Sequence, residues 1–305
     1  MLSFILRRLL IIIPMALLVV TLTWGLIRLA PGSFYSGEKT LPPAIEENIK
    51  KKYGLDKPWY QQYFLMISNV VRGDFGDSLK YQGESVNDII RRHLPYSATI
   101  GFLAYLVALI VGLTAGIIAA LKQNSPFDYG SMATAMLGLS VPNFVLGPVL
   151  VLIFALGLYW LPPARWGGIT NIILPVLTLS AIYMAYIARL TRAGMLEVMR
   201  SDYIRTARAK GLNEKTVLLK HALRGGIIPV VSFTGPALAG LLAGTVVIEK
   251  VFAIPGLGNI FIQSVLNRDE PLILGIVAFL SILIMIFNLL VDISYGFLDP
   301  RIRYE

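Results

Sequence analysis

Six long apolar runs are spaced along the chain, separated by segments rich in polar and charged residues. A helix that crosses a bilayer needs about 20 mostly apolar residues, so each run predicts one membrane-spanning helix. The third run is long enough to be tilted, or to be broken at Pro142 and Pro148, and the fourth is the shortest. The expected spans are 9–29, 96–121, 132–160, 172–187, 227–248 and 272–294.

Small residues recur inside two of these runs, in "VGLTAGIIAA" (111–120) and "GPALAGLLAG" (235–244). In lipid, small residues let helix backbones approach closely. Ordinary small-residue usage explains the pattern equally well, so close packing at these positions is an open expectation.

Composition indicates that lipid is the solvent for much of the chain. Of 305 residues, 56% are hydrophobic and 15% are charged, against roughly 25% charged in an ordinary globular domain. The absence of cysteine excludes disulfides, thiolate catalysis and cysteine metal sites. His93 and His221 lie far apart, and no His/Asp/Glu cluster has metal-ligand spacing, so we expect neither a catalytic nor a metal site. The chain is thus an all-α integral membrane protein with six transmembrane helices.

The distribution of basic residues predicts the orientation of these helices. Cytoplasmic loops collect Lys and Arg, which also explains the net charge of +9 better than nucleic-acid binding does. With the N-terminus in the cytoplasm, the short outer loops carry only Arg165, Lys250 and Arg268. The inner side then holds Arg7, Arg8, Lys122, the nine basic residues from Arg189 to Arg224, Arg301 and Arg303. Both termini are therefore expected in the cytoplasm, and the first run, longer than a signal-peptide core, is expected to be a retained helix.

The first outer loop, 31–95, is expected to fold. Its "LPPAIEENIKKKYGL" has Pro42 and Pro43 suited to a helix start and Gly54 suited to a helix end. The aromatics of "WYQQYFLMISNVVRGDFGDSL" can form a small core or a membrane-interface anchor.

A basic segment, "RSDYIRTARAKGLNEKTVLLKHALRGG" (200–226), lies between the fourth and fifth runs. Ser201 or Asp202 can cap a short helix that Gly211 ends, and Asn213 can cap a second helix. A lipid-headgroup anchor or a merely positive-inside loop would not need this capped arrangement. The pattern therefore favours a protein-docking site.

"RTARAKGL" followed by "HALR" resembles the cytoplasmic loop of binding-protein-dependent ABC importer permeases, E-A-A-x-x-x-G, nine residues, then I-x-L-P. Gly211 matches the glycine, but only the second alanine and the leucine of the rest are kept. The E-A-A positions are occupied by Arg205, Thr206 and Ala207, and the I, L and P positions by His221, Leu223 and Arg224. This form, with "RLAPGS", "GDFGDS", "AALKQN", "SVPNFV", "IPGLGNIF", "LNRD" and "DPRIRY", resembles B-type permease subunits of the oligopeptide and dipeptide branch over nearly the whole chain.

The resemblance implies a type I ABC importer permease fold with a large extracytoplasmic loop. The expected organisation is an N-terminal transmembrane helix (1–30), an extracytoplasmic loop domain (31–95) and a five-helix permease core (96–305) with a cytoplasmic coupling loop (189–226). It also implies a bacterial inner-membrane location. The implied partners are a second permease subunit in a heterodimer, two cytoplasmic ATPase subunits, an extracytoplasmic binding protein, a peptide substrate and the lipid bilayer.

The resemblance also assigns roles to residues. ATPase coupling is expected at Tyr203, Arg205, Thr206, Ala207, Lys210 and Gly211. The translocation pathway is expected to include Ser140, Asn143, Tyr183, Ser232 and Thr234. The chain has no nucleotide-binding motif, so ATP and Mg²⁺ are expected in the partner ATPases, and this chain is expected to bind no cofactor and to be no enzyme.

Several alternatives remain open at this point. Permeases for dipeptides, glutathione, nickel or sugars are similar. An ion-coupled secondary transporter would place ionisable residues at membrane depth, but Arg28, Arg189 and Asp292 lie near span ends. An intramembrane protease would need H-E-x-x-H or a paired nucleophile and base, and the spans contain no histidine.

Overall fold

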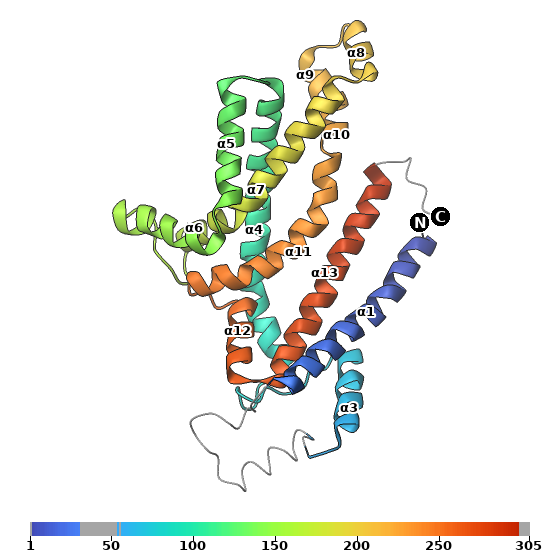
Figure 1. The fold of residues 1–305 in the computed structure, drawn as a ribbon, viewed down its shortest axis with the longest axis vertical. Coiled ribbons are helices and arrows are strands. Elements are labelled where there is room, and N and C mark those ends of the chain that lie inside the picture. Colours follow the sequence, from blue (N-terminus) through green and yellow to red (C-terminus); the bar gives the residue numbers. More distant parts are fainter. Residues whose placement is uncertain (1, 31–53, 55, 299–305) are drawn as a thin grey trace.

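The computed structural model describes residues 2–30, 54 and 56–298. Within them the chain is helical, and an isolated bridge between Asp77 and Ser85 is the one β-type pairing found there. The helix expected over "LPPAIEENIKKKYGL" lies outside the described residues, apart from Gly54. In chain order the helices are α1 (Leu2–Leu29), α3 (Trp59–Val71), α4 (Val86–Leu121), α5 (Pro126–Ser140), α6 (Asn143–Leu150), the π-helix η2 (Val151–Gly157), α7 (Ile169–Met199), α8 (Asp202–Ala209), α9 (Glu214–Thr216), the π-helix η3 (Val217–Ala222), α10 (Leu223–Gly226), α11 (Ile228–Val251), α12 (Leu257–Asn267) and α13 (Glu270–Leu298) (Figure 1).

Four helices in the described ranges are each long and apolar enough to cross a membrane. They lie in α1, α4, α7 and α13, and two bent helix pairs raise the number to six if each pair is one span. One pair joins α5 to α6–η2 through a bend of 109°, and the other joins α9–α10 to α11 through a bend of 47°.

The third expected span is broken at Pro142 but not at Pro148. α5 ends at Ser140 and α6 begins at Asn143, whereas Pro148 lies inside α6, which continues into η2. A proline inside a membrane helix removes one hydrogen bond, and local π-helical adjustment can satisfy the freed groups. The expected break at Pro148 is therefore wrong, and the π-helix that follows gives a physical reason.

The fourth expected span, 172–187, is too short. α7 has 31 residues, or about 46 Å at 1.5 Å per residue, which exceeds the roughly 30 Å hydrocarbon core. Charged residues at Arg189 and Arg192 end the apolar run but not the helix, because a helix that leaves the bilayer can carry them. α4 also starts before the expected span 96–121, at Val86. Ser85 Oγ caps its first turn by accepting a hydrogen bond from the Asp88 backbone amide at 3.1 Å.

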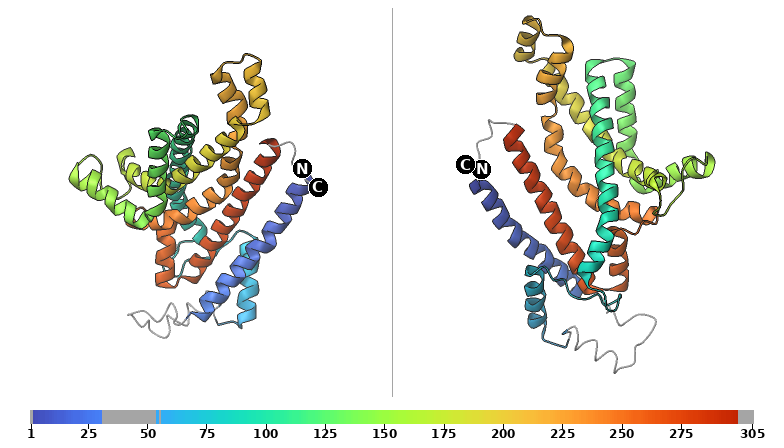
Figure 2. Two further views of the ribbon diagram at one scale, coloured as in Figure 1. Left: turned by 45° about the horizontal axis from the view of Figure 1, so that its top comes forward. Right: turned by 180° about the vertical axis from the view of Figure 1, so that it is seen from behind.

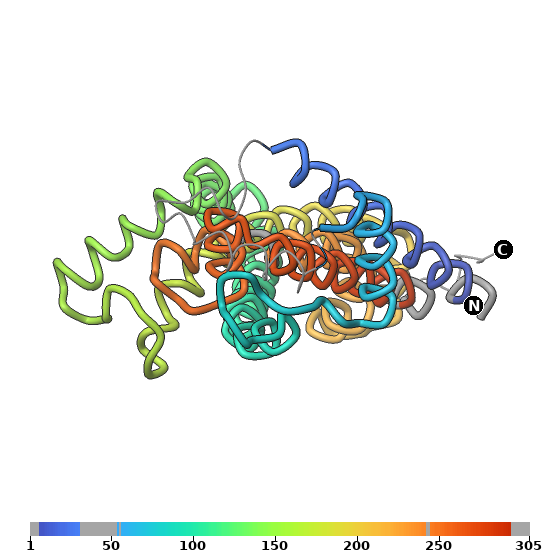
Figure 3. Tube along the Cα trace, turned by 90° about the horizontal axis from the view of Figure 1, so that it is seen from below, coloured from blue at the N-terminus to red at the C-terminus, as the bar shows by residue number. Residues whose placement is uncertain are grey.

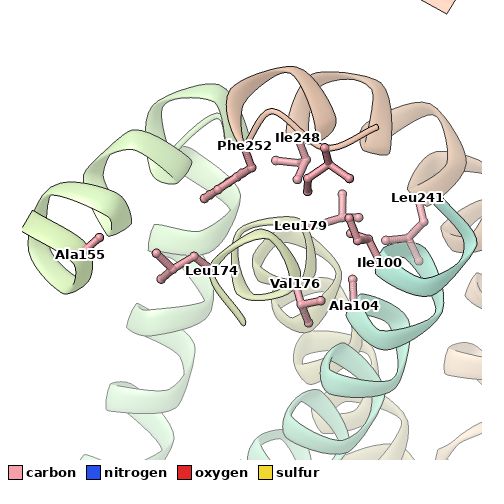
Figure 4. Close-up of a cluster of buried hydrophobic side chains, with 10 residues drawn as sticks. Ile100, Ala104, Ala155, Leu174, Val176, Leu179, Leu241, Ile248 and Phe252 are labelled. Carbon is pink, nitrogen blue, oxygen red and sulfur yellow. The ribbon is translucent and has the colours of Figure 1, made fainter. Parts of the chain in front are cut away.

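Glycines bring α4 and α7 close together. A Cβ at Gly112 would lie 2.8 Å from the Ile187 side chain, and one at Gly116 would lie 2.5 Å from the Ala188 carbonyl oxygen. The expectation of close packing in "VGLTAGIIAA" is thus confirmed at these two positions. The largest buried core lies several turns away, where the earlier turns of α4 and α7 pack together. Figure 4 shows its members from α4, η2, α7, α11 and the residue that follows α11, which include Ile100, Ala104, Ala155, Leu174, Val176, Leu179, Leu241, Ile248 and Phe252.

The helices place two different groups of short segments at opposite ends of the molecule (Figures 1 and 2). We call one the α8 end, made of α8–α10 and the turn between α4 and α5. We call the other the α12 end, made of α3, residues 72–85 and α12. Seen along the bundle, α1 lies at one edge and α6–η2 extends to the opposite edge (Figure 3).

Glu249 holds the α12 end together from inside. Its carboxylate is fully buried and accepts hydrogen bonds from Ser97 Oγ at 2.6 Å and from the Asn259 amide at 2.9 Å. It therefore stabilises the first turn of α12, where free amides favour a negative charge. A Cβ at Gly256 would collide with this carboxyl group, which explains the glycine in "IPGLGNIF". α12 lies between the fifth and sixth expected spans and is too short to appear as an apolar run of spanning length.

Asp269 anchors the segment before α4 in the same way. This buried carboxylate accepts hydrogen bonds from Ser78 Oγ at 2.5 Å and from the Leu79 and Lys80 amides at 3.1 Å each. Burial and the charges of Asp269 and Glu84 raise the pKa of the Tyr81 phenol. The phenol therefore stays protonated and donates to Gln263 Oε1 at 3.0 Å.

Candidate functional site

The α8 end contains the helix–turn–helix that the sequence predicts. Ser201 is the extended residue before α8, and Gly211 follows the helix with a φ of 77°, the left-handed region that glycine enters without strain. Asn213 Oδ1 then accepts a hydrogen bond from the Thr216 backbone amide at 2.8 Å and so caps α9. The helix that follows is not uniform, because η3 separates α9 from α10.

The inner face of α8 packs on the ends of the long helices. Ile204 and Ala207 are buried in a cluster with Ala120 of α4 and Met195 of α7. Val217 of η3 completes this contact. Ala207 therefore faces its own chain and helps to position α8.

The outer face of α8 is exposed. Tyr203 is 50% exposed, and Arg205, Thr206 and Lys210 are exposed as well. Arg205 lies 3.3 Å from the Asp202 carboxylate, and the Thr206 hydroxyl donates to the Asp202 carbonyl at 3.0 Å. Arg208 pairs with Glu214 across the turn at 2.8 Å. These contacts are exposed ion pairs and local bonds, so the face stays open to a partner.

Three of the expected pathway residues lie where α7 meets α11. Tyr183 stacks near Phe233 with ring centroids 6.5 Å apart, and a Cβ at Gly240 would lie 2.6 Å from its hydroxyl. Thr234 Oγ1 lies 2.7 Å from the Tyr105 hydroxyl of α4. Ser232 donates to the Ile228 carbonyl at 3.0 Å. Thr234 therefore links α11 to α4 and Tyr183 packs α7 against α11, whereas the hydrogen bond of Ser232 stays within α11.

The other two pathway residues flank the break between α5 and α6. Ser140 is exposed and donates to the Met136 carbonyl at 2.9 Å. Asn143 Oδ1 is buried and has no hydrogen-bond partner within the described chain. Among the described residues, no side-chain hydrogen bond joins this pair to Tyr183, Ser232 or Thr234. The structure therefore divides the expected pathway residues into two groups.

Sequence reasoning missed the ion pair between Asp128 of α5 and Arg192 of α7. Its two hydrogen bonds measure 2.6 and 2.7 Å, and Asp128 is 1% exposed. A charged residue just past an apolar run is a signal for such a pair, but a separation of 64 positions along the chain hides its partner.

Comparison with known proteins identifies the chain's family. The family model described as binding-protein-dependent transport system inner membrane component matches residues 112–304, and the model for the N-terminal part of such membrane components matches residues 1–101. The chain belongs to this family. It is therefore a multi-pass inner-membrane permease component, and its recognition as an ABC permease of the oligopeptide and dipeptide branch is confirmed.

Individual relatives cover the whole chain. It is 47% identical to the oligopeptide transport system permease protein OppB of Haemophilus influenzae over 306 residues, which is 100% of both chains. It is 43% identical to the dipeptide transport system permease protein DppB of Bacillus subtilis, over 94% of this chain and 93% of that protein.

Solved structures share the fold at low identity. An inward-facing MetNI methionine ABC transporter matches with a TM-score of 0.59 and 16% identity, over 69% of this chain and 96% of that one. An amino acid ABC transporter matches with a TM-score of 0.53 and 18% identity, over 68% of this chain and 93% of that one. The all-helical fold of this permease is therefore that of ABC importer permeases.

Proposed function

We propose that this permease is one of two membrane subunits of an ATP-driven importer of oligopeptides. The observation that carries the proposal is full-length identity of 47% to an oligopeptide permease. The 43% identity to a dipeptide permease is close behind, so dipeptides are the second candidate substrate. Permeases for glutathione, nickel or sugars are weaker alternatives, because the relatives named above are oligopeptide and dipeptide permeases.

The chain spans the membrane six times, with each bent pair counted as one span and both termini in the cytoplasm. The ion pair between Arg8 and Asp292, at 3.1 Å, supports a common side for the start of α1 and the end of α13. The α8 end then faces the cytoplasm, and the large loop of the α12 end faces the extracytoplasmic binding protein.

The outer face of α8 docks onto one of two cytoplasmic ATPase subunits, which bind and hydrolyse ATP with Mg²⁺. The permease itself is not an enzyme and binds no cofactor. Support comes from the exposed face at Tyr203 and Lys210 above a buried inner face. Because α8 packs on α4 and α7, a push from the ATPase moves these helices and switches the pathway between inward- and outward-facing states.

The second permease subunit packs against α6–η2 to form a heterodimer. This segment extends from the bundle (Figure 3) and exposes large apolar side chains. They include Phe144, Leu152 and Leu156, and the residues just after η2 add Tyr159 and Trp160. Lipid covers the outward surface of the helices, and the partner subunit covers the rest.

The pathway hydrates its peptide and does not grip it. Thr178 and Ser232 donate to carbonyls of their own helices at 2.7 and 3.0 Å, so these hydroxyls are already satisfied. The binding protein therefore sets specificity, and the permease has no tight peptide site of its own. Exchange of binding proteins between compatible systems should transfer the peptide preference.

The cross-linking of α8 to an ATPase subunit tests this assignment. A cysteine can be placed at Lys210 because the chain has none, and a cysteine at Leu266 on α12, which is also exposed, is the matched control. We expect Lys210→Cys, and not Leu266→Cys, to cross-link to a cysteine in the ATPase groove. Equal cross-linking at both positions, or at neither, would contradict docking through α8.

A further inference from the structure

The ion pair between Asp128 and Arg192 is built with more contacts than a surface pair needs. Arg192 reaches both carboxylate oxygens with two different nitrogens, and the Asn124 amide donates to the same carboxylate at 3.0 Å. Bidentate arginine–carboxylate contacts fix orientation as well as distance. The pair therefore holds α5 to α7 in one geometry.

The position of this pair is as informative as its geometry. α8 rests on Ala120 and Met195, near the ends of α4 and α7. α5 begins one turn beyond α4 and ends at the 109° bend that precedes α6. A movement of α8 therefore reaches α7 through apolar packing and can reach α5 through the ion pair.

Capping of α5 does not account for the pair. Ser125 Oγ already accepts a hydrogen bond from the Asp128 backbone amide at 3.4 Å. A carboxylate near a helix start is also favourable without any arginine. A second hydrogen bond lies in the same region: the guanidinium of Arg200, the residue after α7, donates to Gln123 Oε1 in the α4–α5 turn at 3.3 Å. Both contacts join the α4–α5 turn to the helix that leads into α8.

We propose that Asp128 and Arg192 form the positioning contact that carries the movement of α8 to α5 and to its break at Val141–Pro142. This inference rests on the proposed coupling through α8. With the contact intact, α5 moves together with α7 when the ATPases close. Without it, α8 can follow the ATPases while α5 stays behind, so ATP is hydrolysed without transport.

The test measures peptide uptake per ATP hydrolysed in proteoliposomes that contain the full transporter complex and its binding protein. Asp128→Asn keeps the acceptor for the Asn124 amide and removes the charge. In Asp128→Asn we expect complex yield and ATP hydrolysis to stay within about twofold of wild type. Peptide uptake per ATP hydrolysed should fall at least about fivefold, which is the lower end of typical coupling between sites. Arg192→Lys, which keeps the charge but loses the bidentate contact, should also lower the ratio.

A charge-swapped variant and a second ion pair provide the controls. Asp128→Arg combined with Arg192→Asp should recover at least half of the wild-type ratio. Asp292→Asn breaks a helix–helix ion pair away from α8 and should leave the ratio unchanged. The proposal would be overturned if Asp128→Asn left peptide uptake per ATP unchanged. It would also be overturned if complex yield, ATP hydrolysis and uptake all fell together in Asp128→Asn, or if the charge-swapped variant did not recover the ratio. A wild-type complex without ATP-dependent uptake would instead contradict the proposed function.

Discussion

The α12 end and the short helix α8 of the opposite end are held by different kinds of contact. At the α12 end, the buried carboxylates of Glu249 and Asp269 each accept several hydrogen bonds, many from backbone amides. α8 itself is held by apolar contacts of Ile204 and Ala207, and its charged side chains are exposed. The buried carboxylate beside it, Asp128, joins α5 to α7 and not to α8. Directional bonds from a buried charge fix one geometry, whereas apolar contacts permit small repacking.

This difference matches the tasks that the two ends would have in a transporter. The α12 end would keep one shape while a binding protein docks, and the α8 end would follow moving ATPases. Buried charges are costly to leave unpaired, and exposed ion pairs contribute little. Substitutions at the two ends should therefore differ in kind, with loss of stability at the α12 end and loss of coupling at the α8 end.

The largest expected effect is that of Glu249→Ala. Removal of this acceptor leaves the Ser97 hydroxyl and the Asn259 amide without their partner. At about 1–3 kcal/mol for each unsatisfied buried group, the free energy of unfolding should fall by about 3–5 kcal/mol. Thermal unfolding in nanodiscs, followed by tryptophan fluorescence, should show this loss. Glu249→Gln, which keeps one acceptor oxygen, should lie between wild type and alanine; an unchanged melting temperature in Glu249→Ala would contradict the assigned role of this carboxylate.

Gly211→Val should impair coupling more than stability. A Cβ at this position would meet no atom within 4 Å, so the cost comes from the left-handed backbone, at about 1–2 kcal/mol or more for a β-branched residue. The turn after α8 would shift, and ATPase binding or uptake should fall while membrane insertion persists. Gly211→Asn is the control, since asparagine tolerates this conformation. Normal transport by the valine variant would show that the turn has no such role.

Cysteine labelling should separate the two groups of pathway residues by a smaller effect. Ser140→Cys lies at an exposed position beside the α5–α6 break, whereas Thr234→Cys replaces a hydroxyl bonded to Tyr105. Labelling from the outside should change with ATP and vanadate at both positions, and Ser140→Cys should react faster. If the labelling rates at both positions were the same with and without ATP and vanadate, that result would count against alternating access through this subunit.

The smallest expected effect is that of Arg208→Ala. Its ion pair with Glu214 is exposed, and such pairs contribute about 0–1 kcal/mol. The free energy of unfolding should change by less than about 1 kcal/mol, measured as above. A loss as large as that of Glu249→Ala would remove the contrast between the two ends.

Apolar run length and capping residues predicted much of this structure. They gave the long helices, the break at Pro142 and the turn around Gly211, because each depends on residues close in sequence. The extension of α7 was missed because Arg189 and Arg192 end the apolar run. The contacts of Glu249 with Ser97 and of Asp269 with Ser78 could not be predicted, since 152 and 191 residues separate the partners. The burial of Ala207 was likewise hidden, because it depends on packing against α4 and α7.

The most direct test of the account is peptide uptake by proteoliposomes that contain this permease, its partner permease and two ATPase subunits. Uptake should require ATP, Mg²⁺ and the binding protein together, and it should be insensitive to a collapsed proton or sodium gradient. Peptide uptake that is driven by an ion gradient without ATP, or by the permease without the binding protein, would contradict the account.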